Sequence, residues 1–332
     1  MIEIDGSHLS GGGQILRTAL GLSVLTGKRF GIKSIRKGRP KPGIKEQHLQ
    51  TINVMKELCN AEVNGDKIGS DFLEFKPNKI NEKELNVEIR TAGSVALVLQ
   101  ALLIAGISNN LKVNINGGGT WNLHAPPVCF LQHVLKPVLK KMNYFFDIEI
   151  LKDGFYPKGN SSVNFKSEKC KLECIDLTKK CKIKEINGIS IASENLIDRK
   201  VCERQKESAE KILFDNFKIK PEIECKYEET LSTGTGILLY IITENSIISS
   251  DNLGELGKRA EYVGKECAEN LIKEYKNGVI DKHIGDQILP YLAFGKGKVI
   301  VSEITDHIKS NIYVIEKFLD VKFEINENEI SV

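Results

Sequence analysis

The feature that most constrains how this chain can fold is a pattern that recurs three times along it. In each copy a short turn leads into an apolar helix, and a strand, a polar loop and a second amphipathic helix follow. The first two copies begin about 80 residues apart, which is far more than the roughly 20–50 residues of a solenoid repeat. The pattern therefore predicts pseudo-symmetric α/β units that pack together.

The copies are placed by apolar residues at helical spacing and by alternation in the strands. The first is entered through Gly11-Gly12-Gly13 and predicts helix 14–25, strand 30–35, loop 36–43 and helix 45–58. The second is entered through Ala92-Gly93-Ser94 and predicts helix 95–107, strand 111–115, loop 116–125 and helix 126–142. The third is entered through Gly285-Asp286-Gln287 and predicts helix 288–294, strand 298–302, loop 303–310 and helix 311–319.

An extra segment, residues 182–278, separates the second copy from the third. Its pattern predicts strands 188–192, 221–225 and 236–242 and helices 199–214 and 256–275. Because loops tolerate the insertion of a whole domain, we predict an α/β fold of two domains. The large domain, 1–181 and 279–332, holds three pseudo-symmetric βα repeat units, and a smaller α/β domain, 182–278, is inserted before the third unit.

Composition and length place the chain among ordinary globular proteins. Its 332 residues include 41% hydrophobic and 27% charged residues, with a net charge of only +3. A nucleic-acid partner can therefore be argued only from local clusters of charge. The longest mostly apolar run, 95–107, is shorter than the roughly 20 residues that cross a bilayer, and the N-terminus has no signal-peptide pattern. We expect a cytoplasmic protein without a membrane partner.

Familiar metal and nucleotide motifs do not match this sequence. The closest cysteines, Cys170, Cys174 and Cys181, have no common zinc spacing, and we expect reduced thiols. The run from Gly21 to Arg29 is one residue too long for a P-loop and lacks its Ser or Thr. The K-x-D-G pattern of common nucleic-acid ligases is also missing. A nucleotidyl-transfer enzyme with this sequence therefore needs another nucleophile than lysine.

The strongest electrostatic feature is the segment 28–45, whose charged residues are all basic. They are Lys28, Arg29, Lys33, Arg36, Lys37, Arg39, Lys41 and Lys45. Arginine forks bind phosphate oxygens two at a time, so the segment suits a nucleotide or an RNA end, although solvated basic turns are common too. The triple glycine offers free N–H groups to an anion at a helix start, and Arg17 within that helix is unfavourable unless an anion lies nearby.

His307 lies in the predicted polar loop 303–310, close to Lys309, Ser310 and Asn311. A neutral imidazole can attack phosphorus and form a phosphoramidate. Its unperturbed pKa of about 6.5 leaves much of it neutral at the pH of a cell. Position alone still favours a structural histidine, because that is the commoner role of this residue.

Together these segments resemble RNA 3′-terminal phosphate cyclases over nearly the whole chain. The resembling stretches are 11–17, 34–43 with Gln47-His48, 92–94 with Gln100, 118–120 with 125–127, 154–157, 285–287 and the loop around His307. Several of these stretches are long, and they occur in the family's order. Chance agreement is therefore remote, and the fold that the resemblance implies is the one predicted above.

The resemblance implies an enzyme that uses ATP and a divalent cation, Mg²⁺ or Mn²⁺, on an RNA with a 3′-phosphate end. The histidine that matches His307 attacks the α-phosphate of ATP and becomes adenylylated, and AMP then passes to the RNA 3′-phosphate. The neighbouring 2′-hydroxyl attacks the activated phosphate, which gives a 2′,3′-cyclic phosphate and releases AMP. No particular oligomeric state is implied.

The resemblance also gives roles to individual residues of this chain. The catalytic candidates are His307, Arg17, Arg36, Arg39 and His48. The ATP-binding candidates are Gln14, Gln100, His283, Ile284, Gly285, Asp286 and Gln287, with Pro127 and Phe130 beside the adenine.

The sequence departs from the family's pattern at five positions, which are Leu9, Ser10, Asn160, Ser161 and His283. Ser10 stands where a glutamate usually helps to hold the metal, so the metal ligands stay unassigned, and His283 replaces a common adenine-stacking tyrosine. Two other functions remain open: a non-catalytic branch of the family that acts in ribosomal RNA maturation, and an enolpyruvyl-transferase-like enzyme. Members of the non-catalytic branch lack the nucleophilic histidine, so His307 favours the cyclase.

Overall fold

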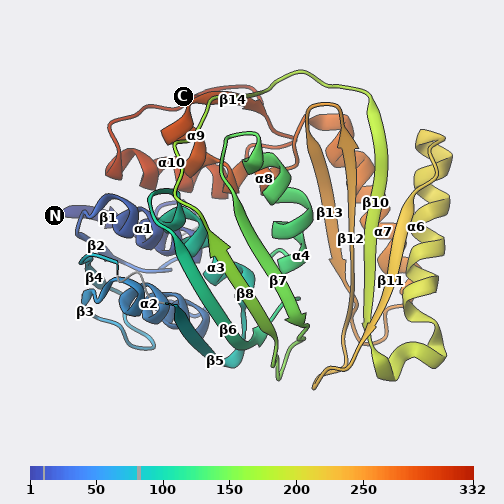
Figure 1. Ribbon diagram of the computed structural model, residues 1–332, viewed down its shortest axis with the longest axis horizontal. Coiled ribbons are helices and arrows are strands. Elements are labelled where there is room, and N and C mark those ends of the chain that lie inside the picture. The colour runs from blue at the N-terminus through green and yellow to red at the C-terminus, as the bar shows by residue number, and fades with distance from the viewer. Residues whose placement is uncertain (10–11, 81–83) are drawn as a thin grey trace.

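Residues 1–9, 12–80 and 84–332 are described by a computed structural model, in which helices pack on four four-stranded sheets (Figure 1). Three of these sheets share one strand order. With the strands of each sheet counted in chain order, the first and second strands pair in parallel. The second strand also pairs antiparallel with the fourth, and the fourth pairs antiparallel with the third.

The elements of these three sheets follow one another along the chain. The first contains β1 (Ile2–Asp5), α1 (Gly13–Thr26), β2 (Phe30–Lys33), α2 (Glu46–Cys59), β3 (Glu62–Asn64) and β4 (Leu73–Lys76). The second contains β5 (Leu85–Ser94), α3 (Val95–Ala105), η1 (Gly106–Ser108), β6 (Leu111–Gly119), α4 (Val128–Phe130), the π-turn η2 (Leu131–Leu135), α5 (Lys136–Lys140), β7 (Phe146–Lys152) and β8 (Ser162–Ser167). The third contains β9 (Ile175–Leu177), α8 (Lys282–Gln287), α9 (Leu289–Gly295), β14 (Gly297–Ile300), α10 (Asp306–Phe318), β15 (Glu324–Asn326) and β16 (Glu329–Ser331).

The fourth sheet is built by the segment between β9 and α8. It contains β10 (Ile183–Ser193), η3 (Glu194–Arg199), α6 (Val201–Phe217), β11 (Glu222–Glu228), β12 (Thr235–Thr243), β13 (Ile247–Leu253) and α7 (Ala260–Asn277). In β12, Ile237 and Leu239 pack toward α6 and α7, whereas Leu238 joins the core of the rest of the chain. Figure 1 shows this layer at the right, with α6 and α7 beside it. One face of this sheet thus shares its core with the rest of the chain. The division of the chain into two domains therefore stays a prediction.

Helix α3 lies at the centre of the large core because its sequence is apolar on every side, which is the mark of a buried helix. The one polar residue within α3 is Gln100. It is therefore the only position at which this helix can offer a hydrogen bond from its side chain to a neighbouring site.

The structure corrects several predicted boundaries. The loop 303–310 ends early, because Thr305 caps α10 through a hydrogen bond from Ile308 N (3.3 Å) and the helix already contains His307. Gly285-Asp286-Gln287 lies inside α8, which Asp281 caps, rather than in a turn that enters a helix. The helix predicted at 126–142 contains a π-turn, and β6 continues to Gly119.

The sequence patterns also missed the first strand and the last two strands of each of the three units, and β13 in the inserted segment. Several are only three or four residues long, too short for alternation to be recognised. Within the described ranges, no helix is long and apolar enough to cross a membrane.

Candidate active site

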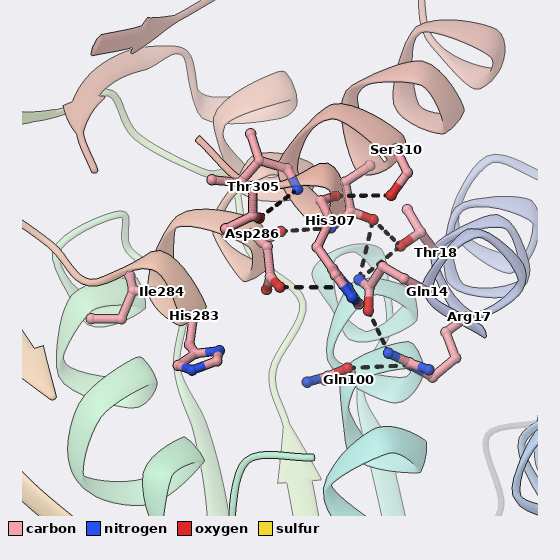
Figure 2. A network of polar contacts seen from close by, with 12 residues as sticks. Gln14, Arg17, Thr18, Gln100, His283, Ile284, Asp286, Thr305, His307 and Ser310 are labelled. Atoms are coloured by element: carbon pink, nitrogen blue, oxygen red, sulfur yellow. Dashed lines mark hydrogen bonds and ion pairs between the residues drawn. The ribbon is translucent and has the colours of Figure 1, made fainter. Parts of the chain in front are cut away.

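A cleft of about 490 Å³ brings together seven residues that the sequence analysis singled out. They are Gln14, Arg17, Gln100, His283, Asp286, Gln287 and His307. Four helices that are distant in sequence, α1, α3, α8 and α10, deliver them to one place (Figure 2). The volume suits a nucleotide-sized ligand, because small-molecule sites commonly enclose roughly 300–1,000 Å³.

His307 occupies the first turn of α10, and its side chain is 45% exposed toward the cleft. Its Nδ1 atom lies 4.0 Å from Oδ2 of Asp286. Burial lowers the pKa of His307, and the nearby charges of Arg17 and Arg39 lower it further. The positive end of the helix dipole acts in the same direction. His307 is therefore a neutral imidazole at neutral pH, the form that can act as a nucleophile.

Behind His307, the buried side chain of Asn311 joins α10 to α1 and α8. Its Nδ2 donates to the carbonyl oxygen of Asp286 (2.8 Å), and its Oδ1 accepts from Thr18 Oγ1 (2.7 Å) and from Gln14 Nε2 (3.1 Å). Asn311 is 0% exposed, so these bonds do not compete with solvent. Buried polar side chains that are satisfied in this way fix the relative positions of the elements they join.

Arg17 is a buried cation held by two neutral amides. Figure 2 shows its guanidinium between Gln14, whose Oε1 accepts from Nη2, and Gln100, whose Oε1 accepts from Nε at 3.3 Å. Within the described ranges, no carboxylate lies within the 4.0 Å of an ion pair. Burial lowers the pKa of Arg17 to about 10, which still leaves it charged at neutral pH. The charge of Asp286 opposes this shift, yet the pKa of Arg17 stays lowered. A buried charge without a close ion pair is costly, so this site calls for an anion.

His48, in the first turn of α2, lies against the start of α1 near Arg17. Its Nδ1 accepts a hydrogen bond from Lys45 N (3.1 Å), and its Nε2 would be only 2.2 Å from a Cβ at Gly13. Glycine is therefore required at residue 13 by close packing. Burial, followed by the charges of Arg17 and Arg36, lowers the pKa of His48 to about 3, so this imidazole is neutral throughout the physiological range.

Arg36 and Arg39, the two arginines of the basic loop 36–43, differ in what their side chains contact. Arg36 donates through Nη1 to the carbonyl oxygens of Lys41 (2.7 Å) and Gly43 (3.0 Å), so it braces its own loop and does not line the cleft. Arg39 is exposed, yet its charge lowers the pKa of His307. Of the two, Arg39 is the one whose charge reaches the candidate nucleophile.

Four predicted nucleotide-binding residues do not line the cleft. Ile284 and Phe130 are core residues, Pro127 is buried, and Gly285 packs so closely on Val301 that a Cβ would lie 2.7 Å from it. The cleft wall in the region of Pro127 is made by Leu123, Ala125 and Pro126 instead. Contacts of the four residues with a nucleotide stay predictions.

Some cleft residues were not predicted from the sequence, because their place depends on tertiary packing. Asp251, at the end of β13 in the inserted segment, lines the cleft, and burial raises its pKa to about 6. Burial likewise raises the pKa of Asp286 to about 7. The side-chain oxygens Asn122 Oδ1 and Gln287 Oε1 are buried without a hydrogen-bond partner. Such orphaned acceptors are rare in proteins, and here both belong to residues that line the cleft.

The described residues contain no group of three or more His, Cys, Asp or Glu side chains that could hold a metal ion. Ser10, which stands where the family's metal-binding glutamate is expected, lies outside the described residues together with Gly11.

Known proteins resemble this chain along nearly its whole length. The family model described as RNA 3′-terminal phosphate cyclase matches residues 8–325. A protein of Thermococcus gammatolerans is 43% identical over 336 residues, which cover 99% of this chain and 95% of the relative. Proteins of Methanopyrus kandleri (39% identical; 99% and 96% covered) and Saccharolobus solfataricus (40% identical; 98% and 96% covered) are similarly close. All three relatives are described as RNA 3′-terminal phosphate cyclase.

Proposed function

Because the chain belongs to the RNA 3′-terminal phosphate cyclase family, we propose that it uses ATP to convert an RNA 3′-phosphate into a 2′,3′-cyclic phosphate. The observation that carries this proposal is the pairing of a neutral His307 with the buried, unpaired cation Arg17 in one cleft. A nucleophile and an anion site are the two parts that nucleotidyl transfer needs. The presence of His307 also favours this activity over a non-catalytic role.

The first step is attack on ATP. With its Nδ1 proton directed at Asp286, His307 presents the lone pair of Nε2 to the α-phosphate, and pyrophosphate leaves as the N–P bond forms. Formation of the bond places positive charge on the ring. Asp286 stabilises that charge or takes up the Nδ1 proton, a role for which its raised pKa of about 7 is suited.

The later steps consume the adenylate. An oxygen of the RNA 3′-phosphate attacks the phosphorus held on Nε2, the N–P bond breaks, and AMP is joined to the RNA end. The adjacent 2′-hydroxyl then attacks the RNA phosphate, loses its proton, and expels AMP. Because this hydroxyl is held next to its target, ring closure benefits from proximity. Arg17 and Arg39 offset the charge of the two phosphate groups as they approach.

The cleft fits an ATP molecule by size and by polarity. The amide side chains of Asn122 and Gln287, which line the cleft and each hold an unsatisfied oxygen, can turn to pair with ribose hydroxyls or with the adenine amine, and Arg17 supplies the cation for a phosphate. The described residues form no metal-binding group, so the divalent cation that we expect to accompany ATP is given no ligands from them. We also propose that the three sheets of equal strand order are the pseudo-symmetric repeat units, and that 182–278 is an inserted domain.

The proposed function is tested with an RNA whose 3′-phosphate carries a radioactive label. Incubation with ATP should make the label resistant to phosphatase and release one AMP for each protected end. Acid treatment, which opens a cyclic phosphate, should restore sensitivity. Protection that does not depend on ATP, or no protection at all, would count against the proposal.

Arg39→Ala should slow adenylylation of the protein by roughly 10- to 150-fold, because a hydrogen bond between charged groups contributes about 1.5–3 kcal/mol. The rate is measured by single-turnover labelling with ATP. Arg29→Ala is the matched control, because Arg29 is also exposed and basic but is not among the charges that act on His307. Equal rates for the two variants would show that Arg39 contacts no phosphate.

The pH profile of adenylylation should report the charge environment of His307. Only the neutral imidazole attacks, so the rate falls as the pH drops through the pKa of His307, which burial, Arg17 and Arg39 hold below its ordinary value. Removing the Arg39 cation raises this pKa. The acid limb of the Arg39→Ala profile should therefore lie at higher pH than that of the wild type, and a shift to lower pH would contradict the assignment.

A further inference from the structure

The exposed face of α10 carries a row of basic and aromatic side chains that the proposed reaction does not use. Lys309, Tyr313 and Lys317 follow one another at intervals of four residues, which places them on one face of the helix. Lys309 and Lys317 are exposed and Tyr313 is partly exposed. Because α10 begins beside His307, the row leads away from the candidate nucleophile along about 15 Å of helix.

A second aromatic ring, from the turn after β1, stacks on this row. The ring centroids of His8 and Tyr313 are 4.1 Å apart and the rings are inclined by 21°. The hydroxyl of Tyr313 accepts a hydrogen bond from Asp5 N (3.1 Å), and Lys317 Nζ lies 5.7 Å from the Tyr313 centroid. The pair is thus held in place by the backbone, while both rings stay partly exposed.

The basic loop extends the row toward the cleft. Backbone hydrogen bonds from Gly6 N to Lys33 O (2.7 Å) and from Arg36 N to Gly6 O (3.3 Å) hold this loop against the turn that carries His8. Hydrogen bonds from Ser7 lower the pKa of Asp5, and the charge of Lys37, the residue after Arg36, contributes to the same shift. Lys37 itself is exposed. Its neighbour Arg39 acts on His307. We call the set His8, Lys37, Lys309, Tyr313 and Lys317 the α10 strip.

The cations of the α10 strip are available to an external anion. In the part of the chain that the structure describes, no carboxylate lies within 4.0 Å of Lys37, Lys309 or Lys317. Glu316 of the same helix is engaged elsewhere, with Lys322 Nζ (2.7 Å) and Phe323 N (2.9 Å). Asp5 accepts two hydrogen bonds from Ser7.

The part of the cleft lining that comes from β13 and the residues just after it is acidic. It contains the carboxylates Asp251 and Glu255, which repel a phosphate backbone. A polyanion whose end reaches His307 therefore meets attraction on the side of the basic loop and α10, and repulsion on the side of β13.

We propose that the α10 strip binds the single-stranded nucleotides that precede the RNA 3′-phosphate, an inference that rests on the proposed function. Single-strand binding sites combine cations that follow the backbone with aromatic rings on which bases stack, and the α10 strip offers both. Bases stack on the His8–Tyr313 pair, and Lys37, Lys309 and Lys317 hold phosphates. The strip thus makes a longer RNA a better substrate than a single nucleotide.

The test compares cyclisation of a single-stranded RNA of ten nucleotides with that of a mononucleotide, both bearing a 3′-phosphate. The wild type should prefer the longer substrate in kcat/KM. His8→Ala should reduce this preference by roughly 5- to 150-fold, the range of one lost base stack, and His8→Phe should restore it. Lys37→Ala with Lys317→Ala should lower the slope of log affinity against log salt by about 1.4, or about 0.7 for each lost phosphate contact.

Three controls separate this inference from the proposed function. Adenylylation by ATP alone and cyclisation of the mononucleotide should be unchanged in every variant. If the wild type lacked both activities, the proposed function would be refuted, and not the role of the α10 strip. Lys211→Ala with Lys273→Ala, exposed cations of α6 and α7, should leave the length preference intact. The proposal would be overturned if the wild type showed no preference for the longer RNA, or if the variants kept that preference. It would also be overturned if cyclisation of an RNA duplex depended on the α10 strip as strongly as cyclisation of the single strand does.

Discussion

Replacing His307 with alanine is expected to abolish the covalent adenylate that forms when the protein is incubated with ATP labelled at the α-phosphate. The imidazole is the only nucleophile in the proposed first step, and it is His307 whose Nδ1 lies 4.0 Å from Asp286 Oδ2 in the cleft. Cyclisation of RNA should be lost with the adenylate. The covalent species is measured as label that stays with the denatured protein, is stable to alkali and is labile to acid, as a phosphoramidate is.

Two further measurements make this prediction specific. His307→Asn keeps a polar side chain at the start of α10 without a nucleophile, so ATP should bind to it about as well as to the wild type while no adenylate forms. His133→Ala removes a histidine that lies outside the cleft and should label normally. If His307→Ala is labelled as strongly as the wild type, the nucleophile is another residue and the proposed mechanism is wrong.

The sequence predicted those parts of the site that depend on long, strongly patterned helices. The apolar spacing around Arg17 placed it inside a helix, and its cost beside a helix N-terminus indicated an anion nearby; the structure finds Arg17 buried between two amides. Gln100 came from the family resemblance, although it also interrupts an otherwise apolar helix. The helical place of Arg17 was predictable because local pattern determines the face on which a helical residue lies.

The remainder of the site depends on information that local pattern does not carry. Thr305-Asp306 is a helix start signal that the loop interpretation of 303–310 overlooked. Asp251 reaches the cleft only because β13 packs against the rest of the chain, which no local pattern shows. Arg36 illustrates a third case, because a sequence does not reveal that the donors of a guanidinium are already occupied by backbone carbonyls of its own loop.

Arg17→Ala is expected to reduce the rate of adenylylation by roughly 10²–10³-fold, the usual effect of removing one preorganised donor from a site where charge develops. The guanidinium is 8% exposed and is held by Gln14 and Gln100 before any ligand arrives, so it needs no rearrangement to meet a phosphate. The rate is measured by single-turnover labelling at saturating ATP. A loss confined to ATP affinity would instead show that Arg17 binds the ground state and the transition state equally.

Arg17→Lys distinguishes charge from geometry at the same position. Lysine keeps the positive charge, but its ammonium lacks the planar fork that donates to Gln14 and Gln100 while still facing a phosphate. We expect it to recover only a small part of the lost rate. Thermal unfolding with and without inorganic phosphate or ATP gives an independent readout: either anion should stabilise the wild type by binding beside the unpaired cation, and this stabilisation should shrink in Arg17→Ala. Equal stabilisation of both proteins would mean that the anion binds elsewhere and that Arg17 is structural.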